Sequence, residues 1–146
     1  MTISEAQREM RFAYANGSTG ALASGFIWLA AGAVAVIFSP GQGALALFIG
    51  GMFIFPLSIL LSKIAGCNGK HSSQNPLGVL ALEGTVLMLA CFPIAFAAYL
   101  YRAEWFFPAM LLVIGGRYLT FQTLYGMRLY WLLGGALLTG AMLLIA

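Results

Sequence analysis

Two charged side chains, Glu83 and Arg117, interrupt stretches of the sequence that are otherwise apolar. A charge at the centre of a membrane helix costs about 2.5–3.5 kcal/mol on insertion scales, so such residues usually face other helices and find a partner. A carboxylate and a guanidinium at similar depth can form an ion pair, bind a small ion or polar solute, or move a proton. We therefore take Glu83 and Arg117 as the candidate polar centre.

The residues that follow Arg117 add many hydrogen-bonding groups. The further candidate ligand-binding residues are Tyr118, Thr120, Gln122 and Tyr125. An ion pair needs only one partner, so this excess favours a site for a small polar or anionic solute. Threonines that bond back to the preceding turn, and tyrosines that mark a membrane interface, are the structural alternatives.

The composition indicates whether these residues lie in water or in a membrane. Of the 146 residues, 62% are hydrophobic and 8% are charged, and the mean hydropathy is +0.94. Soluble domains carry about 25% charged residues, so this composition predicts an integral membrane protein. The net charge of +3 is spread along the chain, which is typical of topology signals and argues against a nucleic-acid partner.

Apolar runs of roughly 20 residues are long enough to cross the hydrocarbon of a bilayer. They predict five spans, at about 19–39, 43–62, 78–100, 106–126 and 129–146. Residues 1–18 are polar, with Ser4 and Gln7 at the spacing of a capping box and Asn16-Gly17 as a stop signal, which predicts a short interfacial helix. The expected fold is an all-α polytopic transmembrane bundle that forms one membrane domain, residues 1–146.

The distribution of cations predicts the orientation of the chain, because cytoplasmic loops carry the excess of lysine and arginine. With a cytoplasmic N-terminus, the cations on the cytoplasmic side are Arg8, Arg11, Lys63, Lys70 and Arg128, and Arg102 alone is external. In this topology Glu83 lies roughly 9 Å and Arg117 roughly 16 Å from the cytoplasmic ends of their helices, so the two side chains can meet. Five spans place Ala146 outside or in the outer leaflet, so the chain either stops at the interface or continues into a sixth helix.

A short internal similarity relates two of the expected spans. The segment "LFIGGMFIF" (47–55) aligns with "LVIGGRYLT" (112–120), which places Met52 opposite Arg117. This pattern indicates a parallel repeat of two helical hairpins, in which only one copy carries the charge. The glycine pairs are interpreted as sites of close helix packing.

Other kinds of chemistry have little support in the sequence. His71 is the only histidine, there is no aspartate, and Cys67 and Cys91 form no metal-binding or redox motif. The sequence therefore predicts no metal, no cofactor and no catalytic set. An intramembrane enzyme that used Glu83 as a base is the weaker alternative.

Three segments carry a resemblance to a known group: "ALALFIGGMFIFPLSILLSK", "NPLGVLALEGTV" and "EWFFPAMLLVIGGRYLTFQTLYGMRLYW". With these motifs the chain resembles a family of small bacterial multi-pass membrane proteins that carries a domain-of-unknown-function label. The resemblance covers nearly the whole chain. It implies a bacterial inner membrane and no particular activity.

The functional prediction is a small transporter or channel-like protein for a small polar or ionic solute. Because so short a chain encloses little pore, we expect a homo-oligomer in the lipid bilayer. The alternative is a module that does not transport, but binds lipid or a partner membrane protein. In that alternative Glu83 and Arg117 form a structural ion pair.

Overall fold

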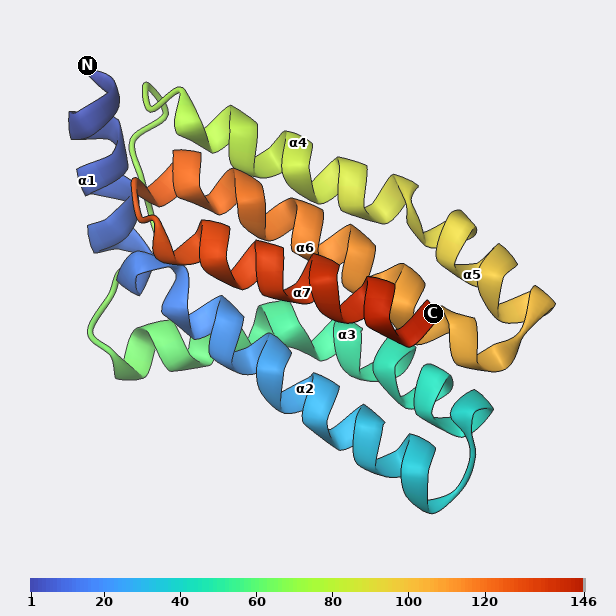
Figure 1. The fold of residues 1–146 in the computed structure, drawn as a ribbon. Helices are drawn as coiled ribbons and strands as arrows, with labels where there is room; N and C mark the ends of the chain where they lie inside the picture. Colours follow the sequence, from blue (N-terminus) through green and yellow to red (C-terminus); the bar gives the residue numbers. More distant parts are fainter. Residues whose placement is uncertain (146) are drawn as a thin grey trace. The chain divides into compact units, whose positions relative to one another are not determined.

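The computed structural model describes residues 1–145, and Ala146, the last residue of the predicted fifth span, lies outside the described residues. The elements are α1 (Ile3–Ala13), η1 (Ala15–Gly17), α2 (Ser18–Ile37), α3 (Pro40–Ile64), α4 (Leu77–Ala90), α5 (Phe92–Tyr101), η2 (Ala103–Trp105), α6 (Phe106–Tyr125) and α7 (Leu129–Ile145). The described residues contain helices and turns and no strand (Figure 1). The prediction of an all-α fold is confirmed.

Membrane-spanning length is reached by three segments of the described chain: Ala15–Ile37, Pro40–Ile64 and Leu77–Tyr101. The third combines α4 and α5, which are separated at Cys91 because Pro93 in the first turn of α5 has no backbone N–H to donate. The helix α6 has 20 residues, but its arginine, glutamine and threonines reduce its hydropathy. The helix α7 has 17 residues. The chain is thus compatible with a membrane protein, and the count of five spans stays a prediction.

The N-terminal cap of the first helix lies two residues earlier than the sequence predicted. The side-chain oxygen of Thr2 accepts from the backbone N–H of Glu5 at 3.3 Å, and Glu5 Oε2 accepts from the backbone N–H of Thr2 at 2.7 Å. This reciprocal pair is a capping box, so the expected box of Ser4 and Gln7 is wrong. After α1 the chain turns at Asn16 (φ 59°) and Gly17 (φ 77°), as the stop signal predicted.

Close contacts divide the chain into two compact units, one formed by residues 9–71 and the other by residues 1–8 with 72–146. In the first unit, α2 and α3 run side by side as a hairpin (Figure 1). The buried hydroxyls of Thr19 and Ser62 lie 2.9 Å apart and join the two helices near one end. The single membrane domain expected for residues 1–146 stays a prediction.

In the second unit, α6 and α7 run side by side and α4 lies along α6 (Figure 1). The side chain of Asn75 starts α4 by accepting from the N–H of Leu77 at 3.0 Å, and donates to the carbonyl of Ala6 at 3.1 Å. Gln7 Nε2 donates to the carbonyl of Thr123 at 2.8 Å. The first residues of α1 are thereby held across one end of α4 and α6.

Glycine permits the close approach of α6 and α7. A Cβ atom on Gly134 would lie 2.9 Å from the carbonyl oxygen of Gly115, and one on Gly115 would lie 3.2 Å from the carbonyl oxygen of Gly134. A side chain at either position would force the two backbones apart. Small residues allow this close approach between helices in membrane bundles. The packing interpretation therefore holds at these two positions.

The two proposed repeat copies have different packing partners. Gly50 of α3 meets Ile27 of α2, the helix that precedes it. Gly115 of α6 meets Gly134 and Leu138 of α7, the helix that follows it. The short sequence similarity thus does not extend to equivalent helix pairs.

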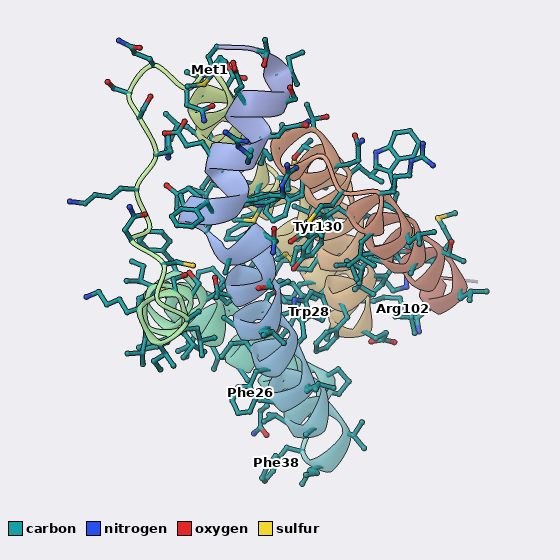
Figure 2. All side chains as sticks on the ribbon, turned by 90° about the vertical axis from the view of Figure 1, so that its left-hand side faces the viewer. Met1, Phe26, Trp28, Phe38, Arg102 and Tyr130 are labelled. Carbon is teal, nitrogen blue, oxygen red and sulfur yellow. The ribbon has the colours of Figure 1, made fainter. Side chains whose placement is uncertain are left out.

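Large apolar side chains cover the outside of both units. Figure 2 shows Phe26 and Phe38 projecting outward from α2 and its C-terminal end, and each side chain is 69% exposed. On α4, Val79, Leu82 and Val86 are also exposed. Exposed apolar surface on this scale is rare on soluble monomers and suits a helix surrounded by lipid.

Candidate functional site

Arg117 lies on α6 at the contact with α4. Its Nη1 donates to the carbonyl oxygen of Gly84 at 3.3 Å and approaches the Met88 sulfur at 3.6 Å. Its Nη2 donates to Thr85 Oγ1 at 3.0 Å. The guanidinium group therefore spans slightly more than one turn of α4, from residue 84 to residue 88.

The sequence of α4 explains why the guanidinium reaches its backbone. Gly84 has no side chain to cover its own carbonyl oxygen. The hydroxyl of Thr85 donates to the carbonyl of Ala81 at 2.9 Å, which leaves its oxygen as an acceptor for Arg117. This back-bond is the behaviour expected of threonine in a membrane helix.

The expected ion pair between Glu83 and Arg117 is not formed. Within residues 1–145 the salt bridge that the structure shows joins Arg102 and Glu104, at 2.8 Å, and both of these side chains are exposed. Glu83 is exposed on α4. Glu83 precedes Thr85 by two residues, about 200° around a helix, so its side chain faces away from the Thr85 side chain that Arg117 contacts. Any ligand-binding role of Glu83 stays a prediction.

An aromatic cluster adjoins the guanidinium. It consists of Tyr118, Phe121 and Tyr125 of α6 and Tyr130 of α7. The carbon Cζ of Arg117 lies 5.6 Å from the centre of the Phe121 ring, within the range of a cation–π contact.

Tyr130 holds the aromatic cluster together. Its ring stacks on that of Tyr118 with centroids 6.0 Å apart, and lies 5.3 Å from Phe121 and 5.5 Å from Tyr125. The turn that brings α7 back along α6 passes through Gly126 with φ 65°, a left-handed conformation that suits glycine. The three tyrosine side chains are buried.

The sequence-predicted residues are therefore only partly brought together. Tyr118 and Tyr125 join the cluster beside Arg117. Thr120 donates to the carbonyl of Arg117 at 2.7 Å, which is the structural alternative for that residue. Gln122 is half-buried and takes no part in the hydrogen bonds of Arg117 that the structure describes.

Sequence reasoning missed the acceptors on α4 and the tyrosine on α7. Gly84 and Thr85 directly follow Glu83, so the position along α4 was right and the chemical group was wrong. Tyr130 was missed because it follows the break that ends α6. Its spacing of five residues from Tyr125, across a glycine turn, was the available signal.

The arrangement is not that of a metal site, since the described residues include no group of three or more potential metal ligands. The site offers instead a half-buried cation with phenol rings beside it. Such donors suit an anion or the partial negative charge of a polar solute.

Comparison with known families supplies the remaining context. The model of a family of unknown function, DUF7010, matches residues 3–146. The chain belongs to this family. The expected resemblance to a domain-of-unknown-function family is thereby confirmed.

Membership of DUF7010 provides no activity for the site, because the family itself is of unknown function. No curated protein and no solved structure matches the chain. For this DUF7010 member the geometry around Arg117 is therefore the feature that points to a function.

Proposed function

We propose that this DUF7010 protein is a small multi-pass membrane transporter or channel-like protein for a small anion, which binds at Arg117. The observation that supports the proposal is the guanidinium group itself. It is half-buried between α4 and α6, and within the described residues no carboxylate lies in ion-pair distance of it. All its described hydrogen-bond partners are neutral, so its positive charge is not cancelled by the protein.

The magnitudes show that Arg117 can be accommodated without such a carboxylate. Hydrogen bonds between membrane helices contribute about 0.6–1.7 kcal/mol each, and a cation–π contact about 0.5–2 kcal/mol. The bonds to Gly84 and Thr85 and the contact with Phe121 thus offset much of an insertion cost of about 2.5–3.5 kcal/mol. The side chain is stable in place, yet it retains a full charge that an anion can neutralise.

The aromatic cluster packs beside the charge of Arg117 through Phe121. Phe121, which contacts Arg117, is flanked by Tyr118 and Tyr125 of the same helix, and a phenol O–H is a group that can donate to an anion. Packing against Tyr130 restricts the rotation of their rings. A charged donor with rigid neutral donors beside it favours weak, reversible binding, as conduction or transport requires.

The proposal includes five spans with a cytoplasmic N-terminus in the cell inner membrane. In it, α6 and α7 each cross the bilayer, as do α2, α3 and the combined α4–α5 segment. The lower hydropathy of α6 then has a functional reason, because polar residues in a span are tolerated where they face other helices. A homo-oligomer would supply the further lining that one short chain lacks.

A second candidate function has its own supporting observation. Every described hydrogen bond of the Arg117 side chain is made to α4, and two of its acceptors belong to the adjacent residues Gly84 and Thr85. This is also what a structural clamp between two helices of a non-transporting module would need. In that case lipid or a partner membrane protein would be the ligand of the module.

The two candidates are separated by flux measurements on proteoliposomes. Swelling in isosmotic chloride, nitrate, acetate or phosphate salts, with a cation ionophore present, reports entry of each anion by light scattering. We expect anion-dependent swelling with the wild-type protein and at least a tenfold loss with Arg117→Met. Arg102→Gln removes one exposed positive charge and is expected to leave the swelling rate unchanged.

Whether the Arg117 variants fold completes this test. If the wild-type protein shows no anion entry above empty vesicles and neither Arg117→Met nor Arg117→Lys folds, the clamp is supported. If Arg117→Met folds normally and retains wild-type swelling, the anion proposal is wrong. Lysine keeps the charge but cannot bond Gly84 and Thr85 as a planar fork does, so it separates charge from geometry.

A further inference from the structure

The unit formed by residues 9–71 carries all of its charge at one end. Its charged residues are Glu9, Arg11, Lys63 and Lys70, and the 51 positions from 12 to 62 contain none. The opposite end of the α2–α3 hairpin, at Phe38 and Ser39, is therefore uncharged. Three cations against one anion give this end a net positive charge.

Two long-range contacts bring these cations together. The N–H of Gly69 donates to the carbonyl of Ala13 at 3.0 Å, and the hydroxyl of Tyr14 lies 2.7 Å from His71 Nδ1. These bonds fold the loop after α3 back onto the end of α1. Lys70 thus lies in sequence between two anchored residues, and Arg11 lies within one turn of Ala13.

The fold of this loop depends on glycine. Gly66 and Gly69 have φ values of 74° and 65°, in the left-handed region that costs other residues free energy. Gly66 ends the helical stretch by donating to the carbonyl of Lys63 at 3.1 Å. The loop therefore has a defined fold that presents Lys70 on the surface, and it follows Lys63 in the last turn of α3; both lysines are exposed.

The surface formed by Arg11, Lys63 and Lys70, which we call the basic end, lies at the boundary of two candidate spans. Lys63 is in the last turn of α3, and Arg11 comes four residues before the span that begins at Ala15. Phe12 and Ile64, the neighbours of two of these cations, are 81% and 75% exposed. Cations flanked by exposed apolar side chains are typical of surfaces that lie among lipid headgroups.

We propose that the basic end is a binding surface for the headgroups of anionic phospholipids. Charge complementarity and position both support this occupant. Within the described residues Lys63 and Lys70 have no carboxylate in ion-pair distance. Residues at the boundary of the hydrocarbon meet the phosphates of the surrounding bilayer before any soluble partner, and Phe12 and Ile64 are placed to enter the acyl region.

This inference is independent of the proposed function, because it concerns neither Arg117 nor the aromatic cluster. The test is lipid binding by native mass spectrometry of the purified full chain, with phosphatidylglycerol as the anionic probe and phosphatidylcholine as the neutral one. We expect the wild type to bind phosphatidylglycerol more tightly. Each substitution among Arg11→Gln, Lys63→Gln and Lys70→Gln should weaken that binding about fivefold, the effect of one cation near a membrane surface.

Two control variants make the result specific. Arg102→Gln also removes one exposed cation and should change phosphatidylglycerol binding less than twofold. Tyr14→Phe keeps every charge but removes the contact with His71, and should weaken binding at least twofold because the loop is released. Equal affinity for the two lipids in the wild type would overturn the proposal.

The remaining outcomes also decide the proposal. A loss with Arg102→Gln equal to that with Lys70→Gln would overturn it, because general charge would then explain the binding. Wild-type affinity in Tyr14→Phe would overturn the role of the folded loop. Displacement of phosphatidylglycerol by equimolar inorganic phosphate would show a small-anion site instead of a lipid surface.

Discussion

Arg117 on α6 donates to the hydroxyl oxygen of Thr85 on α4, with Nη2 and Oγ1 3.0 Å apart. The same threonine donates to Ala81 of its own helix at 2.9 Å. A guanidinium is thus joined to a neighbouring helix through neutral groups only. The hydrogen bond holds the guanidinium against α4, and the positive charge of Arg117 is not neutralised.

A double-mutant cycle measures this contact. We expect Thr85→Val and Arg117→Met to show a coupling free energy of about 0.6–1.7 kcal/mol, the range for interhelical hydrogen bonds in membranes. Thermal unfolding of the detergent-solubilised protein provides the free energies. The matched cycle of Glu83→Gln with Arg117→Met should be additive within about 0.5 kcal/mol, because no ion pair joins these residues.

The outcome of the second cycle is decisive for the geometry of α4. Strong coupling between positions 83 and 117, with none between 85 and 117, would mean that the carboxylate and not the hydroxyl faces the arginine. The orientation of α4 relative to α6 would then be wrong.

The contact between Gly115 and Gly134 predicts a steep dependence on side-chain size. A Cβ on Gly134 would lie 2.9 Å from the carbonyl oxygen of Gly115 and 2.8 Å from Leu119. Gly134→Ala is therefore expected to destabilise the protein by about 1–3 kcal/mol, the usual cost of overpacking. The midpoint of thermal unfolding in detergent provides the measurement.

Its neighbour serves as the control for this prediction. A Cβ on Gly135 would meet no atom within 4 Å, so Gly135→Ala should be neutral or slightly stabilising, since alanine is the better helix former. Equal effects of the two substitutions would show that α6 and α7 do not approach closely at Gly134.

The contact between Tyr14 and His71 predicts a loss of stability at alkaline pH. Partial burial raises the pKa of Tyr14 above its ordinary value of about 10. Below that value the phenol is protonated in the folded and unfolded states, so its contribution to stability is fully present. As the pH rises through the higher folded pKa, the unfolded state loses its proton more readily and stability falls.

The unfolding midpoint of the wild type between pH 8 and pH 11.5 tests this sign. Tyr14→Phe lacks the titrating group, so the difference in stability between wild type and variant should shrink above about pH 10. A difference that stays constant across the range would contradict burial of the Tyr14 hydroxyl against His71.

Much of the fold followed from hydrophobic patterning. Runs of apolar residues and the stop signal at Asn16-Gly17 predicted the helix positions to within a few residues, since hydropathy and glycine turns are local properties. The capping box was misplaced because Thr2 and Glu5 satisfy the same spacing rule as Ser4 and Gln7. The local pattern alone does not decide between them.

The candidate site was harder to predict because it depends on helix rotation. Depth along the bilayer correctly placed Arg117 near residue 83, but depth says nothing of which side of α4 faces α6. Rotating α4 about its axis by one residue would bring Glu83 to α6 in place of Gly84. Arg117 would then form an ion pair and not a hydrogen bond to the backbone. Tyr130 required knowledge of how α7 returns along α6, which no local pattern provides.

The most direct test of the central claim is anion binding at Arg117, measured as the thermal stabilisation of the detergent-solubilised protein by chloride, nitrate, acetate and phosphate. A bound anion stabilises the folded state in a saturable manner that follows its concentration relative to its dissociation constant. We predict such stabilisation by at least one of these anions in the wild type and in Arg102→Gln, and its absence in Arg117→Met. Saturable stabilisation of equal size in Arg117→Met, or none by any of the four anions in the wild type, would contradict the account.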